Sequence, residues 1–230
     1  MELSELAFKR LDRNTNASDY IDWAVGLLYE GSDSQSVAML ASFDLEKEPD
    51  AEQVEYYFKL CVSDLGIKLP SQDEWYEALL EYTSDICKKM VSGSLDLKDG
   101  AYELLSIAED NNDPYMLTIW IDLLRDLSEA SHPLKVDNIF FNSSLNLNDY
   151  DACICLTAQQ YISLSSISLP EKFPWVWMCS KCNYVTDLNT WTTSLTACCP
   201  NCTGVSTLKN MRYFEHRDHY LSNIQLKTPN

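Results

Sequence analysis

Hydrophobic residues in the first 170 positions recur at intervals of three and four. This spacing places them on one face of an amphipathic helix, and short polar turns separate one such stretch from the next. The pattern predicts helices that begin near residues 18, 34, 50, 71, 96 and 114. It is strongest after residue 71, where Trp75, Leu79 and Tyr82 begin a stripe that continues to Met90. The stretch 150–164 fits a helix less clearly, because Ile and Thr are scattered along it.

Residues at the ends of these stretches support the predicted helices. Ser18-Asp19 offers side-chain oxygens to the free amides of a first helical turn. Pro49-Asp50 is a start signal of the same kind, and Gly66 is a typical residue just beyond a helix end. The first part of the chain is therefore predicted to be helical throughout.

The pattern changes after about residue 163. The stretch Ser163–Ser168, followed by Pro170 and Pro174, is polar and rich in residues that interrupt regular structure, and it indicates a linker. We therefore predict a domain boundary between residues 169 and 170. Three short stretches beyond it predict strands: 175–178, 183–188 and 191–197.

The expected fold class is mainly α. An N-terminal, acidic, all-helical domain over residues 1–169 is followed by a small β-rich domain with a C-terminal tail over residues 170–230. No apolar run approaches the roughly 20 residues needed to cross a bilayer. The chain begins with acidic rather than basic residues, unlike a signal peptide, and several cysteines lie within helical patterns. These features predict a cytoplasmic protein without a membrane segment.

Charge is distributed unevenly along the chain. Residues 1–170 carry 11 Lys and Arg against 31 Asp and Glu, a net charge of −20, whereas residues 171–230 carry 6 against 4, a net charge of +2. An acidic domain of this net charge is favourable for solubility, attracts basic surfaces and repels phosphate backbones. We therefore expect a basic protein partner that contacts the densest acidic stretch. Its acidic residues are Asp33, Asp44, Glu46, Glu48, Asp50, Glu52 and Glu55.

Four cysteines near the C-terminus form two Cys-x-x-Cys pairs separated by sixteen residues: Cys179, Cys182, Cys199 and Cys202. Each pair can bring two thiolates to one side of a tight turn, and this spacing is typical of a zinc site. Pairing of Cys198 with Cys202 is also arithmetically open, although Pro200 favours the Cys199 pair. Four thiolates leave no coordination position for water or substrate, so we expect one structural zinc ion and no catalysis by it.

The segments Met178–Asn183 and Cys199–Gly204 resemble the paired knuckles of the zinc-ribbon superfamily, over about residues 173–210. The resemblance implies that the four cysteines are the ligands and that the domain is a strand–knuckle–strand–knuckle unit. In that superfamily the residue after the second cysteine is commonly small, because backbone amides there point at the sulfurs. Thr203-Gly204 fits this rule. The zinc would supply folding free energy to a segment with little core of its own.

His216 and His219 are the remaining candidates for metal ligation, in a segment that also contains Arg212 and Arg217. Basic and aromatic residues together can stack on single-stranded nucleic acid. We interpret this segment instead as a polar surface strand or tail, beside a domain whose charge opposes a polyanion. No phosphate loop, nucleophile elbow or metalloprotease motif is present, so the sequence favours a protein that is not an enzyme.

Residues 18–128 are similar to small acidic bacterial proteins, mostly uncharacterised, some of which look like immunity proteins of polymorphic or contact-dependent toxin systems. The likeness rests on an Asp22-Trp23-Ala24 helix, the turn Gly31–Ser36 and the step Leu40-Ala41. It implies an immunity or defence-associated factor that covers a basic partner such as a toxin. The alternatives are a zinc-ribbon factor that binds nucleic acid or assists transcription through residues 171–230, and an enzyme with a site in the helical domain.

Overall fold

The protein is described by a computed structural model over residues 1–130, 149–169, 173–186, 198–205, 207–211, 213–214, 217–218 and 221. It divides into two compact units, Met1–Asp85 and Ile86–Asn230. The predicted boundary after residue 169 falls within the second unit and stays a prediction. The predicted strand 191–197, together with His216 and His219, lies outside the described residues.

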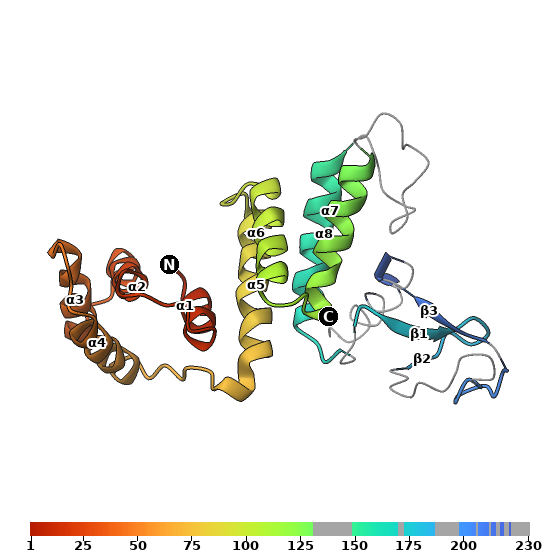
Figure 1. Ribbon diagram of the computed structural model, residues 1–230, viewed down its shortest axis with the longest axis horizontal. Coiled ribbons are helices and arrows are strands. Elements are labelled where there is room, and N and C mark those ends of the chain that lie inside the picture. Colours follow the sequence, from red (N-terminus) through yellow and green to blue (C-terminus); the bar gives the residue numbers. More distant parts are fainter. Residues whose placement is uncertain are drawn as a thin grey trace. The chain divides into compact units, whose positions relative to one another are not determined.

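The first unit is built from helices (Figure 1). In chain order they are α1 (Leu3–Leu11), α2 (Ala17–Tyr29), α3 (Gln35–Ser42), the 3-10 turn η1 (Phe43–Leu45), α4 (Ala51–Asp64), the 3-10 turn η2 (Gln72–Glu74) and α5 (Trp75–Ser92). The first unit includes α5 only as far as Asp85. α3 packs against α2 and α4, and α1 packs against α2. The helices predicted near residues 18, 34, 50 and 71 are confirmed, whereas the sequence pattern did not single out α1.

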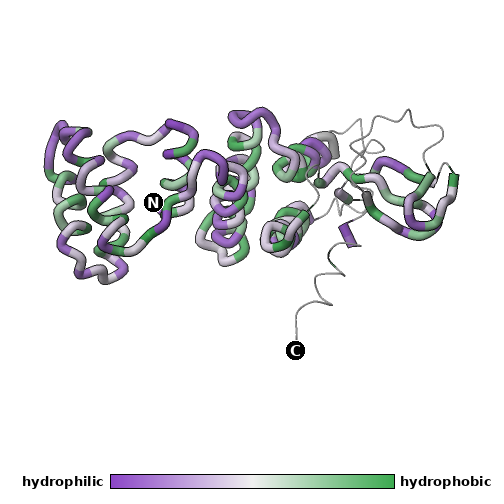
Figure 2. Tube along the Cα trace, turned by 90° about the horizontal axis from the view of Figure 1, so that it is seen from below, coloured by the Kyte–Doolittle hydropathy of each residue, from purple (hydrophilic) through white to green (hydrophobic). Residues whose placement is uncertain are grey.

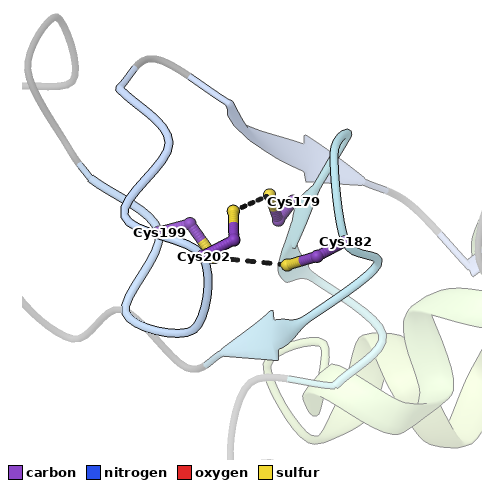
Figure 3. Close-up of side chains that lie close together, drawn as sticks. All are labelled: Cys179, Cys182, Cys199 and Cys202. Atoms are coloured by element: carbon purple, nitrogen blue, oxygen red, sulfur yellow. Dashed lines mark hydrogen bonds between the residues drawn. The ribbon is translucent and has the colours of Figure 1, made fainter.

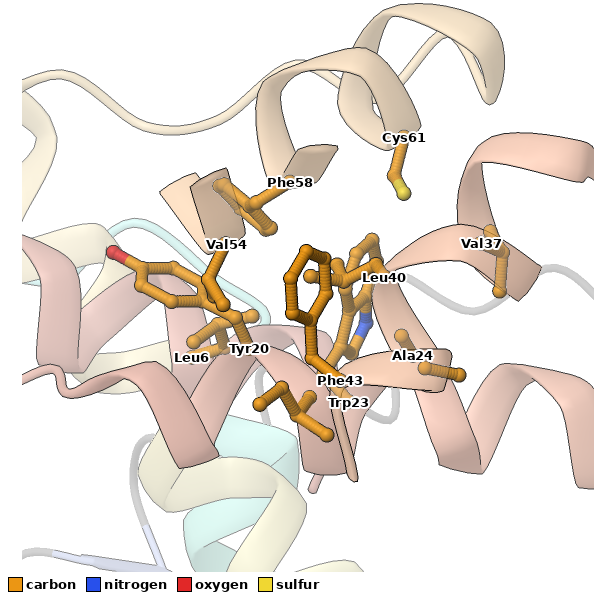
Figure 4. Packing of buried hydrophobic residues seen from close by; sticks show 12 residues of the cluster. Leu6, Tyr20, Trp23, Ala24, Val37, Leu40, Phe43, Val54, Phe58 and Cys61 are labelled. Atoms are coloured by element: carbon orange, nitrogen blue, oxygen red, sulfur yellow. The ribbon is translucent and has the colours of Figure 1, made fainter. Parts of the chain in front are cut away.

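Aromatic side chains form the centre of this first core (Figure 4). The Phe58 ring lies 4.6 Å from the Tyr20 ring and meets the Trp23 ring edge-on at 5.4 Å, measured between centroids. Leu6 from α1 and Leu40 from α3 are fully buried in the same cluster. The periodic apolar positions of four helices therefore meet in one core, which gives the short helices their stability.

The helix ends show which sequence signals are used. Asp50 Oδ1 accepts from the Glu52 amide at 2.9 Å, as the start signal predicted. The first turn of α2 differs from the prediction, because Asn16 and not Ser18 is the capping residue. Asn16 Oδ1 accepts from the Asp19 amide at 3.2 Å and Asp19 Oδ2 accepts from the Asn16 amide at 2.8 Å, which is a complete capping box.

The second unit combines helices with a small sheet. Its elements are the rest of α5, α6 (Leu97–Asp110), the 3-10 turn η3 (Tyr115–Leu117), α7 (Thr118–Ala130), α8 (Tyr150–Ser165), β1 (Val176–Cys179), β2 (Val185–Thr186) and β3 (Leu208–Met211). The strand order is β2-β1-β3, and both pairings are antiparallel. The mainly α fold class is confirmed. The predicted linker was wrong at its start, because Ser163–Ser165 is the last turn of α8.

Hydrophilic and hydrophobic positions alternate along the helical turns (Figure 2). This alternation is what places one face of each helix in a core and leaves the other in water. In the described part of the chain, no helix combines the length and the apolar character that a membrane crossing requires.

Candidate metal centre

The first cysteine loop begins at the end of β1. Cys179 is the last residue of that strand, and its carbonyl accepts from the Asn183 amide at 2.9 Å. The Cys179 amide in turn donates to the Tyr184 carbonyl at 2.9 Å. Asn183 has a φ of +54°, a left-handed conformation that asparagine tolerates better than most residues. These bonds close a tight turn that holds the sulfurs of Cys179 and Cys182 on one side.

The second loop repeats this geometry twenty residues later. The Cys199 carbonyl accepts from the Thr203 amide at 2.8 Å, and the Cys199 amide donates to the Gly204 carbonyl at 3.0 Å. Thr203 has a φ of +56°. A Cβ added at Gly204 would lie 2.9 Å from the Thr207 side chain and 3.3 Å from Cys202 Sγ. The loop therefore favours glycine at this position, because a Cβ would crowd the Thr207 side chain and, less closely, the Cys202 sulfur.

The two loops bring four sulfur atoms together, as the cysteine spacing predicted (Figure 3). All four lie within 4.8 Å of one another. Cys179 Sγ is 3.6 Å from Cys202 Sγ, and Cys182 Sγ is 3.6 Å from Cys199 Sγ. A disulfide would need about 2.05 Å. A tetrahedral metal with bonds of about 2.3 Å places its sulfurs about 3.8 Å apart, so the four cysteines are spaced for a metal ion.

Hydrogen bonds around the sulfurs lower the cost of ionising two of the cysteines. The Lys181 amide donates to Cys179 Sγ at 3.4 Å, and the Asn201 side-chain amide donates to Cys182 Sγ at 3.5 Å. Thr207 Oγ1 lies 3.1 Å from Cys179 Sγ. These groups form an outer shell of the kind that orients metal ligands and tunes their basicity.

The thiol pKa values differ across the cluster. Burial opposes ionisation of Cys179, but hydrogen bonding with Thr207 and with backbone amides outweighs it and lowers the pKa to about 6. The Gly204 amide favours the thiolate of Cys202, yet burial and the three neighbouring sulfurs raise its pKa to about 11. The sulfurs therefore share negative charge unequally, and a bound cation would compensate four adjacent thiolates.

The site is closed on its inner side. Cys179 and Cys199 are buried and pack with Leu208 of β3, while Trp177 covers the cluster from β1. Four sulfur ligands complete a tetrahedron, so the arrangement suits a structural metal rather than a catalytic one.

The structure decides between the two cysteine pairings that the sequence left open. The Cys199 and Cys202 sulfurs belong to the cluster, whereas Cys198 is exposed and forms an isolated β-bridge with Val205. Cys198 is therefore outside the four-sulfur group that the described residues contain.

The acidic residues predicted to contact a partner lie on the first unit, between the end of α2 and the middle of α4. The exposed ones are Asp33, Asp44, Glu46, Glu48, Asp50 and Glu52. Asp50 also caps α4. Glu55 is half-buried and already bound, because its carboxylate accepts from Arg10 Nη1 at 3.0 Å and lies 3.4 Å from Lys59 Nζ.

Arg10 is a residue that the sequence analysis missed. Its guanidinium lies 4.7 Å from the centroid of the Phe58 ring and donates to Tyr20 and to both oxygens of Glu55. Burial alone would raise the pKa of Glu55, but the bonds from Arg10 and Tyr20 outweigh it, so the pKa lies below its usual value. Glu55 therefore joins α4 to α1 and is a structural residue.

Two exposed apolar side chains lie among the acidic residues and were also missed. Leu45, in η1, is 89% exposed, and Tyr56, on α4, is 59% exposed. Tyr56 lines an open hollow of about 470 Å³ with Ala51, Glu52, Glu55 and Lys59. Periodicity could have flagged Leu45, which lies in an acidic turn and outside the buried stripe of any predicted helix.

Comparison with models of known protein families, with curated proteins and with solved structures gives no match.

Proposed function

We propose that the protein is a non-enzymatic binding protein whose first unit covers a basic protein partner through its acidic surface. That surface is the segment Asp33–Glu52. The supporting observation is that five of its carboxylates are exposed and form no ion pair within the described part of the chain. They are those of Asp33, Asp44, Glu46, Glu48 and Glu52.

The charge of the whole first unit supports the same partner. Residues 1–85 carry 6 Lys and Arg against 19 Asp and Glu, a net charge of −13. Within the acidic surface Lys47 is the single cation. A field of this sign speeds the approach of a cationic protein, and the gain falls as salt screens it. A basic toxin, occluded by an immunity-type protein, is a partner of the required charge.

Leu45 within this surface and Tyr56 beside it add apolar contacts to the charge. Apolar and aromatic side chains supply most of the binding energy at protein interfaces, while surrounding charges set the association rate. The partner is therefore expected to present an apolar recess with Lys and Arg around it.

Charge neutralisation tests the proposal. The variant Glu46→Gln/Glu48→Gln/Glu52→Gln removes three charges from the acidic surface. The control Asp73→Asn/Glu77→Gln/Glu81→Gln removes three exposed charges near and along α5. With the partner isolated from the native cell, the first variant should slow association about tenfold at low salt and the control should not. Equal rates for both variants would refute the acidic surface as the contact. Salt-sensitive oligonucleotide binding by the full chain, unaffected by the first variant, would favour the nucleic-acid alternative.

We also propose that the metal is one structural zinc ion and that the cysteine loops with β1–β3 form a zinc ribbon. Four thiolates in a tetrahedron suit zinc, and they also suit iron. Elemental analysis of protein purified without chelator should give about one zinc per chain. Stoichiometric iron, or no metal, would contradict the assignment.

A further inference from the structure

The segment after β3 is anchored on helix α8. Tyr213 is 1% exposed, and its hydroxyl donates to Gln160 Oε1 on α8 at 2.8 Å. Its ring meets the buried Phe173 ring edge-on, with centroids 6.2 Å apart. Phe173 precedes β1, so both ends of the sheet segment contribute to this contact. The residue that follows the sheet is therefore held on a helix of the same unit.

The position of Tyr213 depends on the cysteine loops. It follows β3 after one residue, and β3 pairs with β1, the strand that ends in Cys179. Leu208 of β3 packs against the cluster formed by Cys179 and Cys199. The Thr207 carbonyl, next to β3, accepts from the Ser180 amide of the first loop at 2.8 Å. A metal that fixes the two loops therefore also fixes the strand that carries Tyr213.

Helix α8 needs partners to be stable. Its buried face, Ile154, Thr157, Ala158, Tyr161 and Leu164, follows helical spacing. The Tyr161 ring lies 6.0 Å from the Trp120 ring of α7, and α8 also packs against α6. Gln160, the acceptor for Tyr213, is adjacent to Tyr161 in the chain. Most of the stability of a helix in a protein comes from the packing of its buried face against other elements.

We infer that metal occupancy of the four-cysteine site controls the stability of α8 and its packing on α6 and α7, with Tyr213 as the connecting residue. Without the metal, four adjacent thiols no longer hold the loops, β3 loses its anchor and Tyr213 loses its fixed position. The coupling is reciprocal, because whatever stabilises α8 must strengthen metal binding by the same factor. Binding and loss of the metal then change the stability of α8 and its packing against α6 and α7. This inference rests on the proposed metal site.

Hydrogen–deuterium exchange on the full chain tests it, with Zn²⁺ bound or removed by a strong chelator. Removal should speed exchange of the α8 amides at least tenfold and leave those of α2–α4 unchanged. Zinc content is measured in the same samples. Protein that binds zinc but shows no change in α8 on chelation overturns the inference alone, whereas protein that binds none overturns the metal site as well.

Two tyrosine variants separate the contact from general damage to the sheet. Tyr213→Ala should give fast α8 exchange even with zinc bound, and should weaken zinc binding about tenfold. Tyr184→Ala is the matched control, because Tyr184 is a half-exposed tyrosine of the first cysteine loop. It should leave α8 exchange unchanged. Similar effects of both variants on α8 would overturn the role of Tyr213.

Two further variants test the inference even if Tyr213→Ala does not fold: a milder substitution of Tyr213, and a substitution on α8 whose effect is measured at the metal site. Tyr213→Phe keeps the buried ring and loses only the bond to Gln160, so it should raise α8 exchange by a few-fold. Leu164→Ala lies on α8, outside both cysteine loops, and should nevertheless weaken zinc binding measured by chelator competition. Unchanged zinc affinity in Leu164→Ala, with α8 exchange increased, would refute the coupling.

Discussion

Substitutions at two adjacent positions of the second cysteine loop should change metal affinity in opposite directions. Thr203 is held at a φ of +56°, where a residue with a Cβ costs roughly 1–2 kcal/mol. Glycine removes this cost but adds about 0.5–1 kcal/mol of chain entropy in the unfolded state. Thr203→Gly should therefore tighten metal binding by about 0.5–1 kcal/mol, which is a factor of about two to five.

Gly204→Ala should have the opposite effect. The added Cβ would lie 2.9 Å from Thr207 Cγ2, 3.0 Å from Thr207 Oγ1 and 3.3 Å from Cys202 Sγ. Thr207 would have to move, although its hydroxyl lies against Cys179 Sγ. Overpacking of this kind costs about 1–3 kcal/mol, so metal binding should weaken by a factor of about five to 150.

Competition of the full chain against a chromophoric zinc chelator measures both effects. Thr203→Ala is the control, because it removes the β-branch and keeps the Cβ, and it should gain little. Asn183→Gly, at the equivalent position of the first loop, should gain less than Thr203→Gly because asparagine tolerates positive φ. Weaker binding in Thr203→Gly together with unchanged binding in Gly204→Ala would refute this account of the loop.

The remaining predictions concern the first unit and the spare thiol. Glu55→Gln should lower the free energy of unfolding by about 1 kcal/mol at pH 7, as expected for a bidentate bond with Arg10. The pKa of Glu55 in the folded protein lies below the usual 4.5, so the loss of stability in the variant should be full above pH 4.5 and should vanish as the pH falls through the folded pKa. Urea melts across pH 3–7 measure this loss. A loss that does not depend on pH would contradict the ion pair. Asn16→Ala should cost about 1 kcal/mol in thermal melts, because it removes the acceptor of the capping box, and no loss would mean that the cap is dispensable. Cys198→Ser should keep about one zinc per chain, whereas Cys199→Ser should lose it, as measured by elemental analysis. The reverse result would favour the pairing of Cys198 with Cys202.

Most of the local features of this protein were predictable from the order of its residues. Asp50, Ser71 and Asp96 start helices or the 3-10 turn that leads into one, and Gly66 and Gly93 follow helices with positive φ. Such signals act over three or four residues, so they can be recognised without a tertiary structure. The Cys-x-x-Cys loops are equally local, because each is closed by bonds within five residues.

The binding of Glu55, which sequence analysis missed, depends on residues far apart in the chain. Glu55 belongs to an acidic stretch by sequence, yet it is bound by Arg10, which precedes it by 45 positions. Leu45 lies outside the buried stripe of any predicted helix, but only the structure shows that 89% of it is exposed.

By itself, the sequence determined the helical character of the chain, most of its helix boundaries and the identity of the four clustered cysteines. These depend on short-range periodicity, capping and spacing. Only the tertiary structure decided that β3 joins β1, that Tyr213 reaches Gln160 across 53 positions, and which carboxylates of the acidic surface form no ion pair among the described residues. Those outcomes come from burial and charge pairing between distant segments, and the chain must fold before such partners meet.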